Sequence, residues 1–184
     1  MKNKICGAVI LLLALAYGCS PNVVSLNYEP QTEIGPECEQ RVTVLPFQDA
    51  TGKRELGTNR KGNMIFSDIA VQKWVREAVA DQLESQGCQV RVSDSADSGV
   101  TVGGSVLDVH LQEVSSTEYK GALRLEVILK EAGSDQPELY RETFGVKVSK
   151  HILPGTSRVE SVLQELMQDL MQSMSPKLVQ HMQE

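Results

Sequence analysis

Residues 100–112 read VTVGGSVLDVHLQ, and this stretch decides the fold. Apolar and polar side chains alternate along it, as in a β-strand that is buried on one face. The alternation changes phase, and the two apolar sets are Val100, Val102 and Val106, then Leu107, Val109 and Leu111. The change follows Gly103-Gly104, and a glycine pair suits a bulge or a sharp coil. The sequence therefore predicts a long strand that bends just after the two glycines.

Four further strands are predicted from alternating or β-branched residues. They are Arg41–Phe47, Gln89–Val92, Leu123–Leu129 and Tyr140–Val148. Pro46 should end the first of them or place it at a sheet edge, because proline cannot donate a ladder hydrogen bond. Residues 133–137, GSDQP, are typical of a hairpin loop between the last two strands. Residues 48–63 are polar and punctuated by glycine, which predicts a long surface loop.

Two amphipathic helices are predicted from apolar stripes with helical spacing. The first should begin near the caps Ser67 and Asp68 and stop at Gly87. Its stripe is Val71, Val75, Ala78, Val79 and Leu83. The second should begin at a capping box, SRVE at 157–160, and break at Ser175-Pro176. Its stripe is Val159, Val162, Leu163, Leu166, Leu170 and Met174.

The predicted element order is β-α-β-β-β-β-α. This order fits a single α+β domain with a largely antiparallel, bent sheet of four to five strands. Both helices should then cover one face of that sheet.

The N-terminus reads as an export signal. Lys2 and Lys4 precede the apolar residues 7–16, which fall short of the ~20 residues that span a bilayer. Residues 16–20, AYGCS, resemble a bacterial lipobox, whose cysteine is diacylated and becomes the first residue after cleavage. We therefore expect a signal peptide at 1–18 and a lipid on Cys19. The alternatives are an ordinary secretory signal cut near Gly18 and an uncleaved anchor.

The segment after Cys19 is expected to be a tether. Residues 20–40 lack periodicity and contain three prolines and a glycine, which predicts a flexible, lipidated N-terminus at 19–40 ahead of a periplasmic domain at 41–184. Ser20, rather than aspartate, follows the cysteine, which resembles an outer-membrane address. The expected location is the cell outer membrane, with the domain facing the periplasm.

The charge of the mature chain argues against nucleic-acid binding. Loss of Lys2 and Lys4 lowers the count of Lys and Arg from 18 to 16, against 24 Asp and Glu, a balance of −8. Nucleic-acid binding needs Lys and Arg to neutralise phosphates. Of the four cysteines, Cys38 and Cys88 remain as a pair in a compartment that permits oxidation. They are either a disulfide or two buried free thiols.

Four segments together resemble the YajG family of Gram-negative envelope lipoproteins. They are the amphipathic residues 74–83 leading into Gly87-Cys88-Gln89-Val90, the strand residues 106–109 and 140–144, and the helical residues 162–175. In addition, residues 42–52, VTVLPFQDATG, are similar to the opening strand of CsgG-like and LpoB-like lipoproteins, a secretion pore and an activator of a peptidoglycan synthase. Auxiliary lipoproteins of lipid-transporting ABC systems are similar too. The resemblance implies a small, non-enzymatic α+β domain at the periplasmic face of the outer membrane.

No catalytic or metal-binding pattern is complete. Gly52-Lys53 lacks the rest of a phosphate loop, and Gly103–Leu107 lacks the second glycine of a nucleophile elbow. His110, His151 and His181 fit no zinc spacing, and Asp94 and Asp97 lack the rest of a calcium loop. We therefore expect no enzyme, no cofactor and no metal.

Two groups of residues are candidates for recognition. Lys53, Arg54, Arg60 and Lys61 place four positive charges in an acidic chain, which can seat an acidic partner or anionic headgroups; the alternative is a solvated loop. Met167, Met171, Met174 and Met182 form either an adaptable binding face or part of the core. The expected function is an accessory or assembly factor that binds another envelope protein through the 48–63 loop. The alternative is a lipid-binding auxiliary protein of a lipid-transport system.

Overall fold

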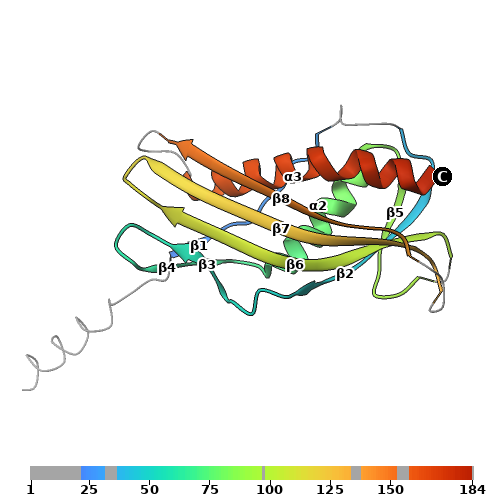
Figure 1. Cartoon of the computed structure of the whole chain (residues 1–184), viewed down its shortest axis with the longest axis horizontal. Helices are drawn as coiled ribbons and strands as arrows, with labels where there is room; N and C mark the ends of the chain where they lie inside the picture. Colours follow the sequence, from blue (N-terminus) through green and yellow to red (C-terminus); the bar gives the residue numbers. More distant parts are fainter. Residues whose placement is uncertain (1–21, 32–36, 97, 134–137, 153–157, 184) are drawn as a thin grey trace, which may run out of the picture.

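The structure is a computed structural model that describes residues 22–31, 37–96, 98–133, 138–152 and 158–183. Within these residues a curved sheet of eight strands carries two helices on one face (Figure 1). The strands are β1 Asn22–Val24, β2 Arg41–Asp49, β3 Glu55–Thr58, β4 Met64–Ser67, β5 Gln89–Val92, β6 Val100–Glu113, β7 Glu118–Glu131 and β8 Glu138–His151. The helices are α2 Val71–Ser85 and α3 Arg158–Gln183.

The long strands β6, β7 and β8 form an antiparallel meander. The other edge of β6 pairs in parallel with β2 along Val42–Asp49 and with β3 at Gly57 and Thr58. The sheet then continues in two branches, from β2 to a parallel β5 and from β3 through an antiparallel β4 to a parallel β1. The sheet is therefore mixed.

The predicted α+β class is confirmed, but the predicted sheet is wrong in strand number, direction and order. β2 and β5 are parallel because the chain between them crosses over through α2, and such a crossover returns the next strand in the same direction. β3 and β4 lie where we predicted a long loop or no element. Each has only four residues, too few for a pattern of alternation to stand out.

The change of phase in β6 has its physical cause in a bulge. The register with β7 shifts between Val106 and Asp108, so Leu107 is the extra residue. This is three residues beyond the predicted position. Gly104 has another role, because a Cβ atom there would lie 1.9 Å from the carbonyl oxygen of Glu126.

The core lies between the sheet and the two helices. All the predicted stripe residues of α3 from Val162 to Met174 are buried, and the stripe continues through Leu178, Val179 and Met182. Pro176 lies inside α3, so the predicted break at Ser175-Pro176 is wrong. The four methionines of this region are buried against the sheet, which supports their alternative interpretation as core residues.

Helix α2 ends as predicted and begins later than predicted. Gly87 takes a φ of 93°, and the amide of Cys88 behind it donates to the carbonyl of Leu83. The N-cap position is held by Ala70, without a side-chain cap. Asp68, which we predicted to be a cap, instead accepts hydrogen bonds from the hydroxyl of Ser25 at 2.6 Å and the amide of Leu26 at 3.1 Å.

Residues 22–31 pack against the domain, contrary to the tether that we predicted for 19–40. Val24 and Leu26 are buried, and β1 adds a strand to the sheet. β1 was not predicted as a strand, because it has only three residues and its partner, β4, was not predicted. Residues 22–31, which we predicted to be part of a flexible tether, thus belong to the folded domain.

Candidate functional site

A shallow depression of about 370 Å³ lies on the face of the sheet that the helices leave uncovered. We call it the glycine depression. Its lining residues come from β2, β6 and β7, and are Leu45, Pro46, Gln48, Thr101, Gly103, Gly104, Ser105, Glu126, Ile128 and Lys130.

The depression exists because two irregularities face each other across the sheet. The pairing of β2 with β6 shifts register between Val44 and Phe47, and Pro46 lies in this shift. Since proline has no amide hydrogen, it is tolerated at such an irregularity. Opposite it, Gly103 presents no side chain to the uncovered face. The result is an open floor beside the apolar side chains of Leu45, Pro46 and Ile128.

Charged residues border the depression on its β7 and β8 side. Glu126 pairs with Arg141 at 3.0 Å, and Lys130 pairs with Glu138 at 3.4 Å. Glu138 also accepts two hydrogen bonds from Arg141, which lower the pKa of its carboxyl to about 2; Lys130 contributes in the same direction. These groups are partly exposed and bonded to one another, so they fix the rim and leave the apolar floor unoccupied by charge.

The four basic residues that we singled out do not form one cluster. Lys53 and Arg54 precede β3, whereas Arg60 and Lys61 lie in the turn after it, and all four are exposed. Arg60 follows Arg54 by six residues, which correspond to ~20 Å of extended chain. The predicted single loop at 48–63 is therefore wrong, because β3 pairs with β4 and β6 and divides it.

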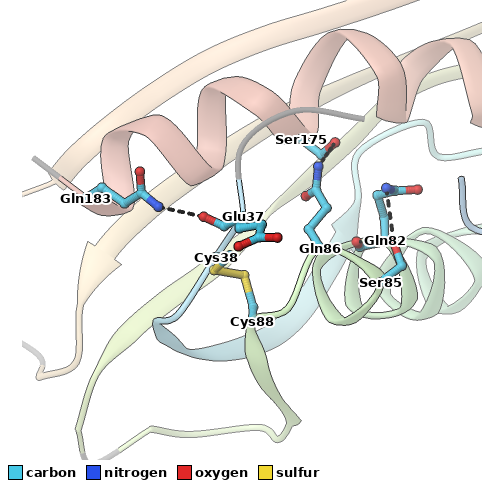
Figure 2. Close-up of a disulfide and its surroundings, with 8 residues drawn as sticks. All are labelled: Glu37, Cys38, Gln82, Ser85, Gln86, Cys88, Ser175 and Gln183. Atoms are coloured by element: carbon cyan, nitrogen blue, oxygen red, sulfur yellow. Dashed lines mark hydrogen bonds between the residues drawn. A yellow bond between two sulfur atoms is a disulfide. The ribbon is translucent and has the colours of Figure 1, made fainter. Parts of the chain in front are cut away.

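Cys38 and Cys88 are joined in a disulfide with a Cα–Cα distance of 4.7 Å (Figure 2). The parallel pairing of Arg41 with Gln89 brings the starts of β2 and β5 together, and the two cysteines lie just ahead of them. The amide of Cys38 also donates to the carbonyl of Gln86 at 2.8 Å. Both cysteines are buried, so the bridge is structural and lies away from the glycine depression.

Gln82 is a buried polar residue that sequence reasoning missed. Its side-chain oxygen accepts hydrogen bonds from the hydroxyl of Tyr28 and the amide of Gln31, and its nitrogen donates to the carbonyl of Gln31 and to Ser85. Figure 2 shows the contact with Ser85 on α2. Burial raises the pKa of the Tyr28 hydroxyl. The only signal in the sequence was a glutamine beside the apolar stripe, and its role is to hold the N-terminal segment.

The histidines lie apart, and no group of three metal-binding side chains occurs in the part of the chain that the structure describes. His110 is exposed on the uncovered face, on the same side of β6 as Asp108, and His151 is exposed at the end of β8. His181 stacks on Tyr140 at 4.2 Å. Asp94 pairs with Arg76 at 3.2 Å, whereas Asp97 and the predicted lipidation site Cys19 lie outside the described residues.

None of the helices among the described residues has the length and apolar character needed to cross a membrane.

No protein-family model matches the sequence, and no curated protein matches it. Solved structures are similar in fold. A DUF330 protein from Xanthomonas campestris is 13% identical, covers 88% of this chain and 96% of its own, and gives a TM-score of 0.62. A hypothetical protein from Chlamydia trachomatis is 12% identical, covers 78% of this chain and 98% of its own, and gives a TM-score of 0.52.

A chain from Caulobacter crescentus described as a "putative lipoprotein" is 10% identical and covers 69% of this chain and 87% of its own, but with a TM-score of 0.39 we base nothing on it. At these identities the comparisons show the fold alone. The resemblance to the YajG family stays a prediction.

Proposed function

We propose that this protein is a lipid-anchored accessory or assembly factor of the outer membrane, which faces the periplasm and binds another envelope protein without catalysing a reaction. The observation that supports it is the glycine depression on the uncovered face of the sheet. The lipid anchor itself rests on the lipobox-like sequence around Cys19.

The glycine depression has the composition of a protein-binding pocket. Its floor at Gly103 is bordered by the apolar side chains of Leu45, Pro46 and Ile128, and its rim is polar and charged. Interface hot spots are enriched in large aromatic side chains that enter such pockets and are ringed by polar contacts. A partner aromatic side chain therefore suits this site, with partner polar groups at Glu126 and Lys130.

This location replaces the 48–63 loop as the proposed partner site. Since β3 separates the two basic pairs, neither pair supplies the four-charge cluster on which the loop hypothesis depended. The depression instead lies on the rigid β2–β6–β7 part of the sheet, and rigid elements lose little conformational freedom when a partner binds.

Lipid binding between the sheet and the helices receives no comparable support. The side chains that would line such a site include Leu125, Leu129 and Leu166, and each is fully buried against its neighbours. These side chains therefore belong to the core between the two layers.

The experiment is in-cell photo-crosslinking with the full chain. A photoreactive residue at Gln48 or Ser105 should give one recurrent protein adduct, identified by mass spectrometry. The Gly103→Val variant should lose this adduct, because the new side chain fills the floor of the depression. A Cβ atom at position 103 meets only Leu45, at 3.4 Å, so the fold should tolerate it.

A matched control is Gly145→Val, on the same face but outside the depression, where a Cβ atom meets only the side chain of Arg124 at 3.6 Å. This variant should keep the adduct. Equal crosslinking by the Gly103→Val variant, or adducts of equal strength from Lys147 on β8, which pairs with Ala122 outside the depression, would show that the depression is not the partner site.

A further inference from the structure

Two turns and the start of β1 lie together at one end of the domain, which we call the two-turn end. They are the β3–β4 turn at 59–63 and the β6–β7 turn at 114–117. The amide of Arg60 donates to the carboxylate of Glu113 at 3.1 Å, which joins the first turn to the strand that leads into the second. Asn22 pairs with Ile65 at the start of β4, so the chain enters the domain here (left in Figure 1).

The surface of the two-turn end combines exposed apolar and positive side chains. Among the described residues, five large apolar side chains are exposed, and three of them lie at this end: Val23 at 51%, Met64 at 54% and Val114 at 39%. Arg60 and Lys61 project from the β3–β4 turn, and neither side chain has an ion pair within the described residues. Glu113 and Glu160 border a neighbouring hollow with Asn22 and Val23, so the positive charge is confined to the turn.

Only a very short segment of chain connects this end to the predicted lipid. Cys19 precedes Asn22 by three residues, which span at most ~11 Å when fully extended. The residues that follow are fixed, because Val24 and Leu26 are buried and Ser25 donates to Asp68. A lipid on Cys19 would therefore hold the two-turn end within ~11 Å of the membrane surface.

We propose that the two-turn end rests on an anionic phospholipid surface. Val23, Met64 and Val114 enter the interfacial region, while Arg60 and Lys61 contact the headgroup phosphates. The remainder of the acidic mature chain is repelled by the same surface and points away from it. This inference rests on the lipid anchor of the proposed function, and adds to it the orientation of the domain.

This orientation sets the distance between the glycine depression and the bilayer surface. Ten residues of β6 separate Gly103 from Glu113, which corresponds to ~33 Å along the strand. The partner site would then lie about 30 Å above the bilayer surface, within reach of the soluble part of another envelope protein.

Tryptophan quenching by lipid tests the contact. The chain has one tryptophan, Trp74, which is buried at 2% exposure and provides a constant background. The lipidated full chain is placed in vesicles of phosphatidylcholine and phosphatidylglycerol that contain brominated lipid. The emission of a Met64→Trp variant should be quenched, whereas that of a Leu139→Trp variant, at the opposite end of β8 from the Glu118–His151 pair, should not.

Charge reversal tests the headgroup contact. The Arg60→Glu, Lys61→Glu double change is made in the Met64→Trp background. In anionic vesicles it should lower the equilibrium ratio of domains whose two-turn end contacts the membrane to domains whose end does not by at least about tenfold. It should have little effect in pure phosphatidylcholine. The matched control is Lys53→Glu, Arg54→Glu, which makes the same change in charge at the far end of β3 and should leave quenching intact.

The outcomes separate the two proposals. A chain that carries the lipid by mass spectrometry, yet shows equal quenching at positions 64 and 139 or none at 64, overturns the membrane contact and leaves the anchor standing. A chain that carries no lipid on Cys19 contradicts the anchored function itself. Equal loss of quenching from both charge-reversed pairs would show a non-specific effect of charge and would overturn the assigned headgroup site.

Discussion

Gly103 and Gly104 are neighbours in the chain but have different surroundings. A Cβ atom at Gly103 points to the uncovered face and meets Leu45 at 3.4 Å, while one at Gly104 would lie 1.9 Å from the carbonyl oxygen of Glu126. The first glycine shapes the depression, and the second permits the close approach of β6 and β7. Their separate roles follow from the direction in which each missing side chain would point.

Replacing each glycine by alanine should separate these roles. Gly104→Ala should destabilise the protein by about 3 kcal/mol, because the strands must move apart. Gly103→Ala should stay within about 0.5 kcal/mol of the parent. Urea unfolding measures both. A Gly104→Ala variant as stable as the parent would mean that the strands relax without cost.

The carboxyl of Glu138 should make stability depend on pH. Its pKa in the folded protein is about 2, below the ordinary 4.5, chiefly because Arg141 donates hydrogen bonds to it. The carboxylate therefore contributes stability above the ordinary pKa and loses it as the pH falls from 4.5 to about 2. Since Glu138 is exposed, the contribution should be small.

A Glu138→Gln variant tests this pH dependence. The difference in urea midpoint between parent and variant should be largest near neutral pH and should vanish as the pH approaches 2, the folded pKa. A difference that is unchanged across this range would indicate a loss of packing at position 138 in place of a loss of charge.

At the scale of elements, α3 continues through Pro176, because the residues that follow the proline are buried. Pro176 cannot donate a hydrogen bond to the carbonyl of Gln172, at a cost of about 3 kcal/mol in a helix interior. Leu178, Val179 and Met182 nevertheless continue the buried stripe. The continued spacing of apolar residues was visible in the sequence, and it was a better guide than the proline.

Pro176→Ala should therefore stabilise the protein, by about 1–3 kcal/mol, because it restores the missing hydrogen bond without changing the buried face. Thermal unfolding measures the change. A lower melting temperature would mean that Leu178 and Val179 pack only on a helix that proline has bent.

The amphipathic helices and long strands could be predicted from the sequence, while the short strands could not. The stripe of α2 and the alternation of β7 carry enough repeats to be recognised. β1, β3 and β4 have three or four residues each, and they form strands because partners far along the chain supply their hydrogen bonds. The glycine depression was equally hidden, since it depends on Pro46 lying opposite Gly103.

At the scale of the whole molecule, the disulfide links the segment ahead of β2 to the start of β5. It closes a loop with a sequence separation of 50 residues. Loss of a cross-link over a loop of this length should cost about 4 kcal/mol in the chain-entropy model. The double variant Cys38→Ser, Cys88→Ser should show this loss in urea unfolding, and the parent should show it on reduction. Equal stability of the oxidised and reduced parent would exclude a stabilising bridge.

The same bridge gives the molecule a mechanical stop. If a partner pulls on the sheet while the N-terminus is held in the bilayer, the load falls first on β1, whose pairing with β4 covers three residues. Residues 22–37 could then detach from the domain and, when fully extended, span ~55 Å. Extension of this segment would end at Cys38, where the disulfide ties the chain to the start of β5 as well as to β2, so that two paired strands share the load. The N-terminal segment would thus allow a limited extension, up to Cys38, between the bilayer and a partner bound to the domain.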